Sequence, residues 1–277
     1  MIISEALRQA ANALAQTSDT ARLDAELLMA HALGVTRSEL LLRHMADAPP
    51  PAFAPLLARR QSHEPIAYIL GTQPFFGLDF LVTPDVLIPR SDSEVLVETA
   101  LQARPDARRV LDCGTGSGAL LLAVLAQLPE AQGIGIDRSL AALAVAAANA
   151  ARLGLAQRAR MLHADWDKAE WSRDLGGPFD LILANPPYVE DDAPLSRSVR
   201  DHEPGGALFA GPAGLDAYRA LIPQISALLA GAGVALVEIG VALAAPVSAI
   251  AAASGLAAKL HRDLAERPRV LELVHSA

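Results

Sequence analysis

The chain has 277 residues, of which 52% are hydrophobic and 19% charged, so it can bury a core and is not a disordered polypeptide. Its net charge of −8 argues against a nucleic-acid-binding surface spread over the whole protein, and we expect no stable nucleic-acid partner. Because there is a single cysteine, no signal-peptide pattern and no long apolar run, we expect a cytoplasmic protein without internal disulfides or a membrane partner.

Residues 1–70 predict a small helical domain. Apolar side chains recur at helical spacing in four segments, at residues 3–14, 20–33, 37–44 and 53–62. The second segment has Asp19 or Thr20 as its cap and stops at Gly34. The histidines here are too scattered for a metal site, and we expect none. The region is either a plain helical bundle or, as we expect, a domain that recognises the substrate.

Residues 71–92 predict a β-hairpin connector between two domains. Two short β-rich runs, the first beginning at Tyr68, flank Gly77-Leu78-Asp79. A turn then leads into a helix, with Ser91 or Ser93 as its cap. The aromatic side chains of this segment either pack the junction or form the wall of a ligand cleft, since clefts favour domain interfaces.

Residues 93–277 predict an α/β domain, because short apolar runs alternate with helical segments. Five runs read as parallel strands, at residues 110–113, 133–136, 159–163, 179–183 and 233–238, and two more follow at 256–261 and 269–274. The loop between the final two is too short for a helical crossover, so they should pair antiparallel. The prediction is a Rossmann-like, doubly wound, seven-stranded sheet, mostly parallel with a terminal antiparallel strand.

Groups that suit an adenosine follow three consecutive strands. The glycine-rich turn Gly114-Thr115-Gly116-Ser117-Gly118 joins the first strand to a helix, and glycine lets a backbone approach a ligand closely. Asp137 ends the next strand, where a carboxylate can accept both ribose hydroxyl protons. Asp165 ends the third, within reach of an adenine amino group, with Trp166 as a stacking surface.

The spacing of this turn favours one of two cofactors. A dinucleotide prefers Gly-x-Gly-x-x-Gly, whereas this turn is Gly-x-Gly-x-Gly and follows an acid, Asp112. An acid beside the loop suits an ammonium group better than a pyrophosphate. S-adenosylmethionine carries adenosine, a sulfonium and an amino acid tail, so we expect this cofactor, with S-adenosylhomocysteine as the product.

The fourth strand ends in Asn185-Pro186-Pro187-Tyr188, a stiff loop because both prolines fix φ. The Asn185 side-chain oxygen and the Pro186 carbonyl can accept the two hydrogens of a planar NH2 group and fix its plane. Both acceptors would hold the nitrogen more tightly as it gains positive charge during attack on a methyl group. Tyr188 can pack on the substrate plane, and no metal or covalent nucleophile is needed. We expect Asn185, Pro186, Pro187 and Tyr188 to bind the substrate, and Asn185 to contact the cofactor as well.

With both motifs in hand, the sequence resembles the release factor glutamine methyltransferase family, also called the HemK family, among the class I S-adenosylmethionine-dependent methyltransferases. The resemblance covers nearly the whole chain. Residues 111–118 look like the cofactor motif, residues 185–188 the catalytic motif, residues 71–80 and 87–90 the connector, and residues 203–219 the segment after the catalytic loop. At Ser91 the family usually has proline, and at Ser93 it usually has threonine, so a hydroxyl is kept there.

The resemblance implies methyl transfer to the side-chain N5 of the glutamine in the Gly-Gly-Gln motif of peptide-chain release factors, in support of translation termination. Three alternatives stay open from the sequence. Adenine N6 is also a planar NH2, so the chain could methylate nucleic acid, although its acidity and its lack of a basic recognition segment count against this. It could methylate a glutamine of a ribosomal protein, or be a non-catalytic module that only binds a nucleoside.

Overall fold

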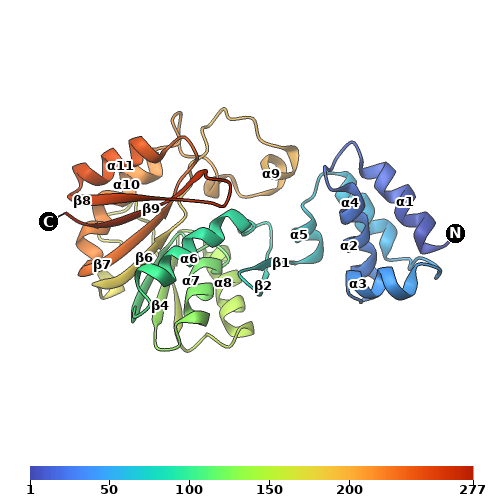
Figure 1. The fold of residues 1–277 in the computed structure, drawn as a ribbon, viewed down its shortest axis with the longest axis horizontal. Coiled ribbons are helices and arrows are strands. Elements are labelled where there is room, and N and C mark those ends of the chain that lie inside the picture. Colours follow the sequence, from blue (N-terminus) through green and yellow to red (C-terminus); the bar gives the residue numbers. More distant parts are fainter. Residues whose placement is uncertain (277) are drawn as a thin grey trace. The chain divides into compact units, whose positions relative to one another are not determined.

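The structure is a computed structural model that describes residues 1–276. The chain forms two compact units (Figure 1). One contains Met1–Thr72 together with Leu195–His202, and the other contains Gln73–Pro194 together with the chain from Glu203 onward.

The smaller unit is helical. Its elements are α1 (Ile3–Leu14), α2 (Ala21–Leu33), α3 (Arg37–Glu39), the π-helix η1 (Leu40–His44), α4 (Phe53–Gln61), α5 (Ile66–Leu70) and α9 (Arg197–His202). The four predicted helical segments are present, and α2 ends at Gly34, whose φ of 71° is the left-handed conformation that glycine tolerates. Apolar faces of these helices form one core, whose fully buried members are Ile3, Leu7, Leu14, Ala25, Leu28, Met29 and Leu40.

A charged pair lies inside this helical unit. The Arg60 guanidinium donates to the Asp24 carboxylate at 2.7 Å, and both residues are buried. The expected β-rich run from Tyr68 is wrong at its start, because residues 66–70 form α5. The Pro65 before it and the left-handed Gly71 after it bound a single helical turn, which is too short to show a helical period in the sequence.

The predicted hairpin is present as β1 (Thr72–Phe75) and β2 (Leu78–Leu81). Its turn is Phe76-Gly77 rather than the expected Gly77-Leu78-Asp79, and both turn residues have positive φ, as two-residue hairpin turns require. Within the larger unit, β2 is bound to α8 (Leu140–Arg152): Asn149 accepts a hydrogen bond from the Leu81 amide at 2.7 Å and donates to the Leu81 carbonyl at 3.0 Å.

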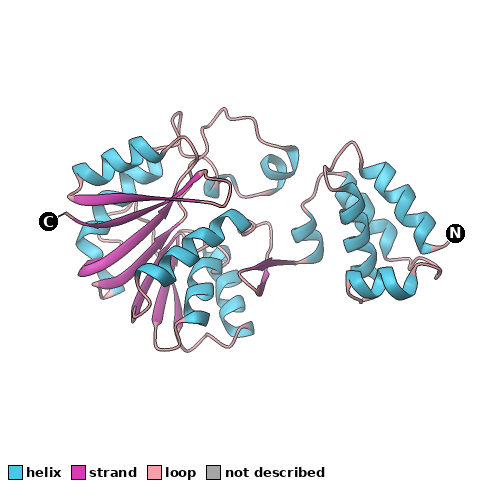
Figure 2. Cartoon of the chain, in the orientation of Figure 1, coloured by secondary structure: helices cyan, strands magenta, loops and turns pink. Residues whose placement is uncertain are grey.

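The larger unit is built on a seven-stranded sheet (Figure 2). Its strands are β3 (Arg109–Cys113), β4 (Gln132–Asp137), β5 (Ala159–His163), β6 (Phe179–Ala184), β7 (Leu229–Glu238), β8 (Leu256–Arg262) and β9 (Pro268–His275), in the spatial order β5-β4-β3-β6-β7-β9-β8. The five strands β5, β4, β3, β6 and β7 pair in parallel in that spatial order. Strand β9 pairs antiparallel with both β7 and β8. The antiparallel strand therefore lies inside the sheet, next to its edge.

Helices cover both faces of this sheet, as Figure 1 shows for the larger unit. One face packs against α6 (Glu94–Ala103), α7 (Ala119–Gln127) and α8 (Leu140–Arg152), and the other against α10 (Asp216–Leu228) and α11 (Ala244–Ala253). The 3₁₀ turns η2 (Ser91–Ser93), η3 (Arg173–Leu175) and η4 (Gly205–Ala207) complete the elements. The central strands β3, β4 and β6 are buried on both faces, so they read as nearly continuous apolar runs, whereas the edge strands β5 and β8 are largely exposed or partly buried.

Candidate active site

The glycine-rich turn folds back on β4 at the carboxyl edge of the sheet. The amides of Gly114 and Thr115 both donate to the Ile136 carbonyl, at 2.9 and 2.8 Å. All three glycines have positive φ, between 53° and 82°, which a side chain would strain. A Cβ at Gly116 would meet nothing within 4 Å, whereas one at Gly118 would press on Leu122 and Ala146. The middle glycine therefore faces open space, and the third lets α7 approach α8.

Asp112 lies beneath this turn and is fully buried. Its Oδ2 accepts a hydrogen bond from the Thr115 hydroxyl at 2.7 Å, and its Oδ1 has no hydrogen-bond partner among the described residues. Burial is the main reason that the pKa of this carboxyl is raised to about 7, and the Asp137 charge also raises it. Hydrogen bonds from Thr115 and the Leu121 amide act in the opposite direction and lower it. The loop thus rests on a carboxyl that carries one unused acceptor.

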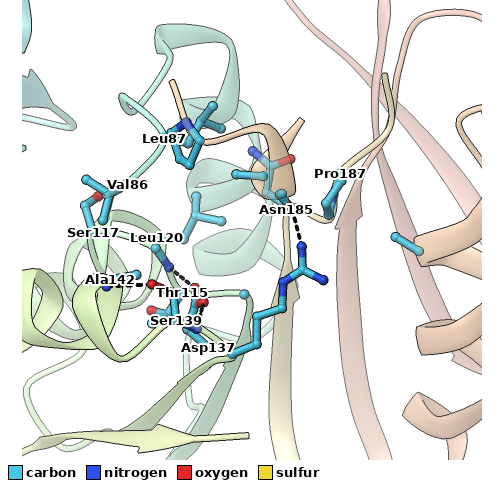
Figure 3. A pocket seen from close by; sticks show the side chains of 18 of the residues that line it. Val86, Leu87, Thr115, Ser117, Leu120, Asp137, Ser139, Ala142, Asn185 and Pro187 are labelled. Carbon is cyan, nitrogen blue, oxygen red and sulfur yellow. Dashed lines mark hydrogen bonds between the residues drawn. The ribbon is translucent and has the colours of Figure 1, made fainter. Parts of the chain in front are cut away.

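A cavity of about 400 Å³ opens above the turn, a volume typical of small-molecule sites. Figure 3 shows Thr115, Asp137 and Ser139 together along its wall, with Asn185 and Pro187 in another part of the lining. The connector contributes Val86 and Leu87. The sequence-predicted residues that the structure brings together here are Gly114, Thr115, Gly116, Asp137, Asp165, Trp166, Asn185 and Pro187.

Four predicted site residues, all in the described part of the chain, do not line this cavity: Asp112, Gly118, Pro186 and Tyr188. Asp112 and Gly118 support the turn from below. Pro186 is buried. Tyr188 packs against Gly240 and Gly214, and burial, followed by the Glu238 charge, raises the pKa of its phenol to about 12, so the hydroxyl stays neutral.

Asp137 is held by two backbone amides. Its carboxylate accepts from the Gly116 amide at 3.0 Å and from the Ser139 amide at 2.8 Å, so it joins the turn to the start of α8. A carboxylate has about four acceptor positions, which leaves two for hydroxyl groups of a ligand. The Trp166 ring lies against Gly114, where a Cβ would come within 3.2 Å of it. Among the described residues, the Asp165 carboxylate accepts a hydrogen bond only from the local Asp167 amide.

The segment at residues 203–219, which follows the Asn-Pro-Pro-Tyr loop, lines another side of the cavity. Glu203 is buried and binds the connector twice: the Arg90 guanidinium donates to it at 2.5 Å and the Ile88 amide at 3.2 Å. Arg138, next to Asp137, donates to the Gly206 carbonyl at 2.9 Å. Pro204, Gly206 and Phe209 of this segment line the cavity.

Sequence reasoning missed the acids Glu203 and Glu238 as functional candidates. Glu238 ends β7 and is buried beside Asn185, whose amide group interacts with it. The rule that found Asp137 and Asp165, an acid at the end of an apolar strand, applies equally to Glu238. Within residues 1–276 no three His, Cys, Asp or Glu side chains are grouped as a metal ion would require. None of the described helices is long and apolar enough to cross a membrane.

Known proteins resemble the chain over most of its length. Residues 5–71 match the PrmC N-terminal domain and residues 105–235 match a methyltransferase domain. A release factor glutamine methyltransferase of Caulobacter vibrioides is 41% identical, covering 91% of this chain and 89% of that protein. One of Cereibacter sphaeroides is 44% identical, covering 93% and 92%.

One similar solved structure supports the fold, but not the activity, of this chain. A methyltransferase of Pyrococcus furiosus superimposes with a TM-score of 0.55 at 17% identity, covering 79% of this chain and 98% of its own. With the seven-stranded sheet and the matching domain model, this confirms the predicted class I methyltransferase fold.

Proposed function

This chain belongs to the release factor glutamine methyltransferase family and is an S-adenosylmethionine-dependent methyltransferase, and we propose that it methylates the side-chain N5 of the glutamine in the Gly-Gly-Gln motif of peptide-chain release factors. The single observation that carries this proposal is that Asn185, an amide at the end of β6, lines the same cavity as the glycine-rich turn and Asp137. A methyl donor and a planar NH2 can therefore be held side by side.

The cavity fits S-adenosylmethionine in three respects. The turn at Gly116 faces open space, Trp166 offers a flat ring against Gly114, and Asp112 keeps one carboxyl oxygen without a hydrogen-bond partner among the described residues. We assign Asp137 to the ribose hydroxyls, and Asp165 with Trp166 to the adenine. Asp112 and Gly118 would hold the turn in shape, and the Asp112 charge would favour an ammonium group above it. When bound, the cofactor supplies an electrophilic methyl group.

In this proposal Asn185 fixes the substrate amide. Its Oδ1 accepts one hydrogen of the glutamine NH2, and the carbonyl of Pro186 accepts the other. The nitrogen lone pair is then aimed at the methyl group, and both acceptors bind the nitrogen more strongly as positive charge develops on it. Pro187 lines the cavity and Tyr188, a neutral phenol, packs beside the loop. The proton leaves to water after transfer.

The test is transfer of a labelled methyl group from S-adenosylmethionine to purified release factors. We expect label on the whole factor, and none on the same factor with its Gly-Gly-Gln glutamine replaced by alanine. Duplex DNA and ribosomal proteins are assayed in parallel. Label on DNA with an unlabelled release factor would establish an adenine methyltransferase instead, and label only on ribosomal protein would move the acceptor glutamine there.

We propose that residues 1–70 recognise the release factor, that residues 71–92 connect, and that residues 93–277 carry out the chemistry. We also propose that the enzyme is cytoplasmic, because its proposed substrate works at the ribosome. The match of residues 5–71 to the PrmC N-terminal domain supports a dedicated role for the helical unit. Deleting residues 1–70 should lower kcat/KM for a whole release factor far more than for a Gly-Gly-Gln peptide. Equal losses for the two substrates would exclude docking as its task.

A further inference from the structure

Asn185 and Glu238 are neighbours across two parallel strands. β6 and β7 pair in register at Ala184 and Val237; Asn185 follows directly after β6, and Glu238 is the last residue of β7. In-register residues of parallel strands lie about 5 Å apart and point to the same face of the sheet. Here that face is the one covered by α6, since Leu183 and Leu236 belong to the core on that side.

Glu238 is a buried acid without a counter-ion of its own. It is 2% exposed, and its Oε2 has no hydrogen-bond partner among the described residues. Arg269 on β9, whose charge interacts with Glu238, is already paired with the carboxylates of Asp92 and Asp263. A buried carboxyl left in this state costs stability, so its position beside a functional amide suggests a task other than stabilising the fold.

Ser93 joins this acid to the amide. The Asn185 Nδ2 group donates to the Ser93 Oγ at 3.5 Å, and the Ser93 hydroxyl in turn interacts with the Glu238 carboxyl, as does the Asn185 amide group. Ser93 is itself buried at the start of α6. Ser93 and Glu238 are both on the NH2 side of Asn185, so its Oδ1 is left for the cavity.

We propose that Glu238 is a positioning residue for methyl transfer: together with Ser93 it binds the NH2 group of Asn185 and so presents the Asn185 Oδ1 to the substrate amide. The inference rests on the proposed function, because it needs an NH2 group as the methyl acceptor. Glu238 touches neither substrate nor cofactor in this scheme and acts through Asn185.

The chemical reason is that an ionised carboxylate only accepts hydrogen bonds. It forces the Ser93 hydroxyl to donate to it, which leaves the Ser93 oxygen free to accept from the Asn185 NH2. An amide side chain can otherwise turn over, and its NH2 would then meet the NH2 of the substrate. A protonated Glu238, or a glutamine in its place, can donate as well as accept, so it no longer selects one orientation of Asn185.

The groups around Glu238 make this selection sensitive to pH. Burial raises the pKa of Glu238 to about 7; Ser93, Arg269 and Asn185 lower it, and Asp92 raises it. Tyr188 and Tyr218 also face it, as neutral phenols, and the Tyr218 hydroxyl donates to the Glu238 carbonyl at 2.9 Å. Glu238 is therefore ionised, and Asn185 correctly oriented, above about pH 7.

The experiment compares Glu238→Gln with the wild-type enzyme on a purified release factor. We expect kcat to fall by about tenfold to a hundredfold near pH 8, with KM for both substrates within about threefold, since orientation matters most in the transition state. The difference should shrink as the pH is lowered through 7, because the wild-type enzyme then also loses its carboxylate. Glu272→Gln on neighbouring β9, whose acid binds Lys259 and His261, is the matched control and should leave kcat unchanged.

A second pair of variants keeps the inference testable if Glu238→Gln does not fold. Ser93→Ala removes the bridging hydroxyl and should lower kcat like Glu238→Gln, whereas Ser93→Thr keeps it and should retain activity. Cofactor affinity, measured by calorimetry, should stay within about threefold in all variants. A Glu238→Gln enzyme with wild-type kcat at every pH would overturn the inference. Failure of the wild-type enzyme to label release factors would instead overturn the proposed function.

Discussion

Arg90 and Glu203 are 113 positions apart in the chain, yet the Arg90 guanidinium donates to the Glu203 carboxylate at 2.5 Å. Arg90 belongs to the connector and Glu203 to the segment after the catalytic loop, so this pair joins two walls of the cavity. Neither residue belongs to the cofactor or catalytic motif. The shape of the cavity therefore depends on a contact outside both motifs.

Replacing Glu203 with alanine should destabilise the protein and weaken substrate binding. The change leaves the Ile88 amide and the Arg90 guanidinium without their acceptor, which costs about 2 kcal/mol in hydrogen bonds to a charged group. Urea unfolding measures the loss, and KM for both substrates should rise. Glu130→Ala, which removes an exposed partner of Arg108, is the control and should change the unfolding free energy by less than about 0.5 kcal/mol.

Replacing Asn185 with alanine should lower the rate of methyl transfer by roughly a hundredfold to a thousandfold while leaving cofactor binding largely intact. In the proposed scheme the side chain is one of two acceptors for the substrate NH2, and its loss removes stabilisation of the transition state. Single-turnover transfer and calorimetric titration with S-adenosylmethionine separate the two effects. A large loss of cofactor affinity with little change in the rate of bound enzyme would show that Asn185 binds cofactor instead. Exposed Asn12→Ala on α1 should behave as wild type.

Gly118→Ala tests the packing beneath the glycine-rich turn, with Gly154→Ala as its matched control. Both glycines have φ above 70°, so alanine pays a similar backbone cost of about 1–2 kcal/mol at each. At Gly154 the new methyl meets nothing within 4 Å, whereas at Gly118 it presses on Leu122 and Ala146. We expect Gly118→Ala to be clearly less stable than Gly154→Ala in thermal unfolding and to bind S-adenosylmethionine more weakly. Equal melting temperatures would contradict this account of the turn.

Asp112 should make the free energy of unfolding depend on pH. Burial raises its pKa in the folded protein to about 7, above the ordinary value of 3.8, so its contribution is most favourable below pH 4 and falls as the pH rises through 7. Asp112→Asn keeps an acceptor for Thr115 and should be more stable than wild type near pH 8, by at most about 4 kcal/mol, with the gain vanishing near pH 4. Chemical unfolding at several pH values measures this, and affinity for S-adenosylmethionine should fall.

Asp263 is a control, because its pKa is lowered in the folded protein and the pH dependence of its contribution to stability therefore has the opposite sign. Although burial raises its pKa, hydrogen bonds from the Arg267 amide, Arg269 and the Ala265 amide bring it down to about 2. Its stabilising effect is therefore present above the ordinary value of 3.8 and is lost as the pH falls through 2. Asp263→Asn should be less stable than wild type at neutral pH, and a gain in stability there would show that these hydrogen bonds do not favour the charged form.

Most helices and strands could be predicted from the sequence because the residues that start, stop and pattern them are close together in the chain. Helix α7 follows the glycine-rich turn, as predicted, and spans Ala119–Gln127, since a glycine precedes it and Leu128-Pro129 stops it. Strand β6 was recognised because a strand buried on both faces is a continuous apolar run. Helices α5 and α9, with five and six residues, are too short to show a period, and both were missed.

From the sequence, the site residues could be predicted only one by one, each from its place at the end of its own strand. Asp137, Asp165 and Asn185 follow apolar runs, and parallel strands bring such ends together. The burial of Asp112, the pairing of Arg90 with Glu203, and the approach of Glu238 to Asn185 depend on contacts between distant segments. No local pattern encodes those contacts.

The position of β9 sets an order for synthesis and folding. Residues 268–275 follow every other strand in the chain, but β9 lies between β7 and β8. A chain emerging from the ribosome must therefore hold β8 apart from β7, with an unpaired edge on each, until these residues are made. Arg269, which binds Asp92 next to Ser93, arrives on the same strand. The nascent enzyme thus completes the antiparallel part of its sheet, β7-β9-β8, and gains the Arg269–Asp92 pair in the same late step.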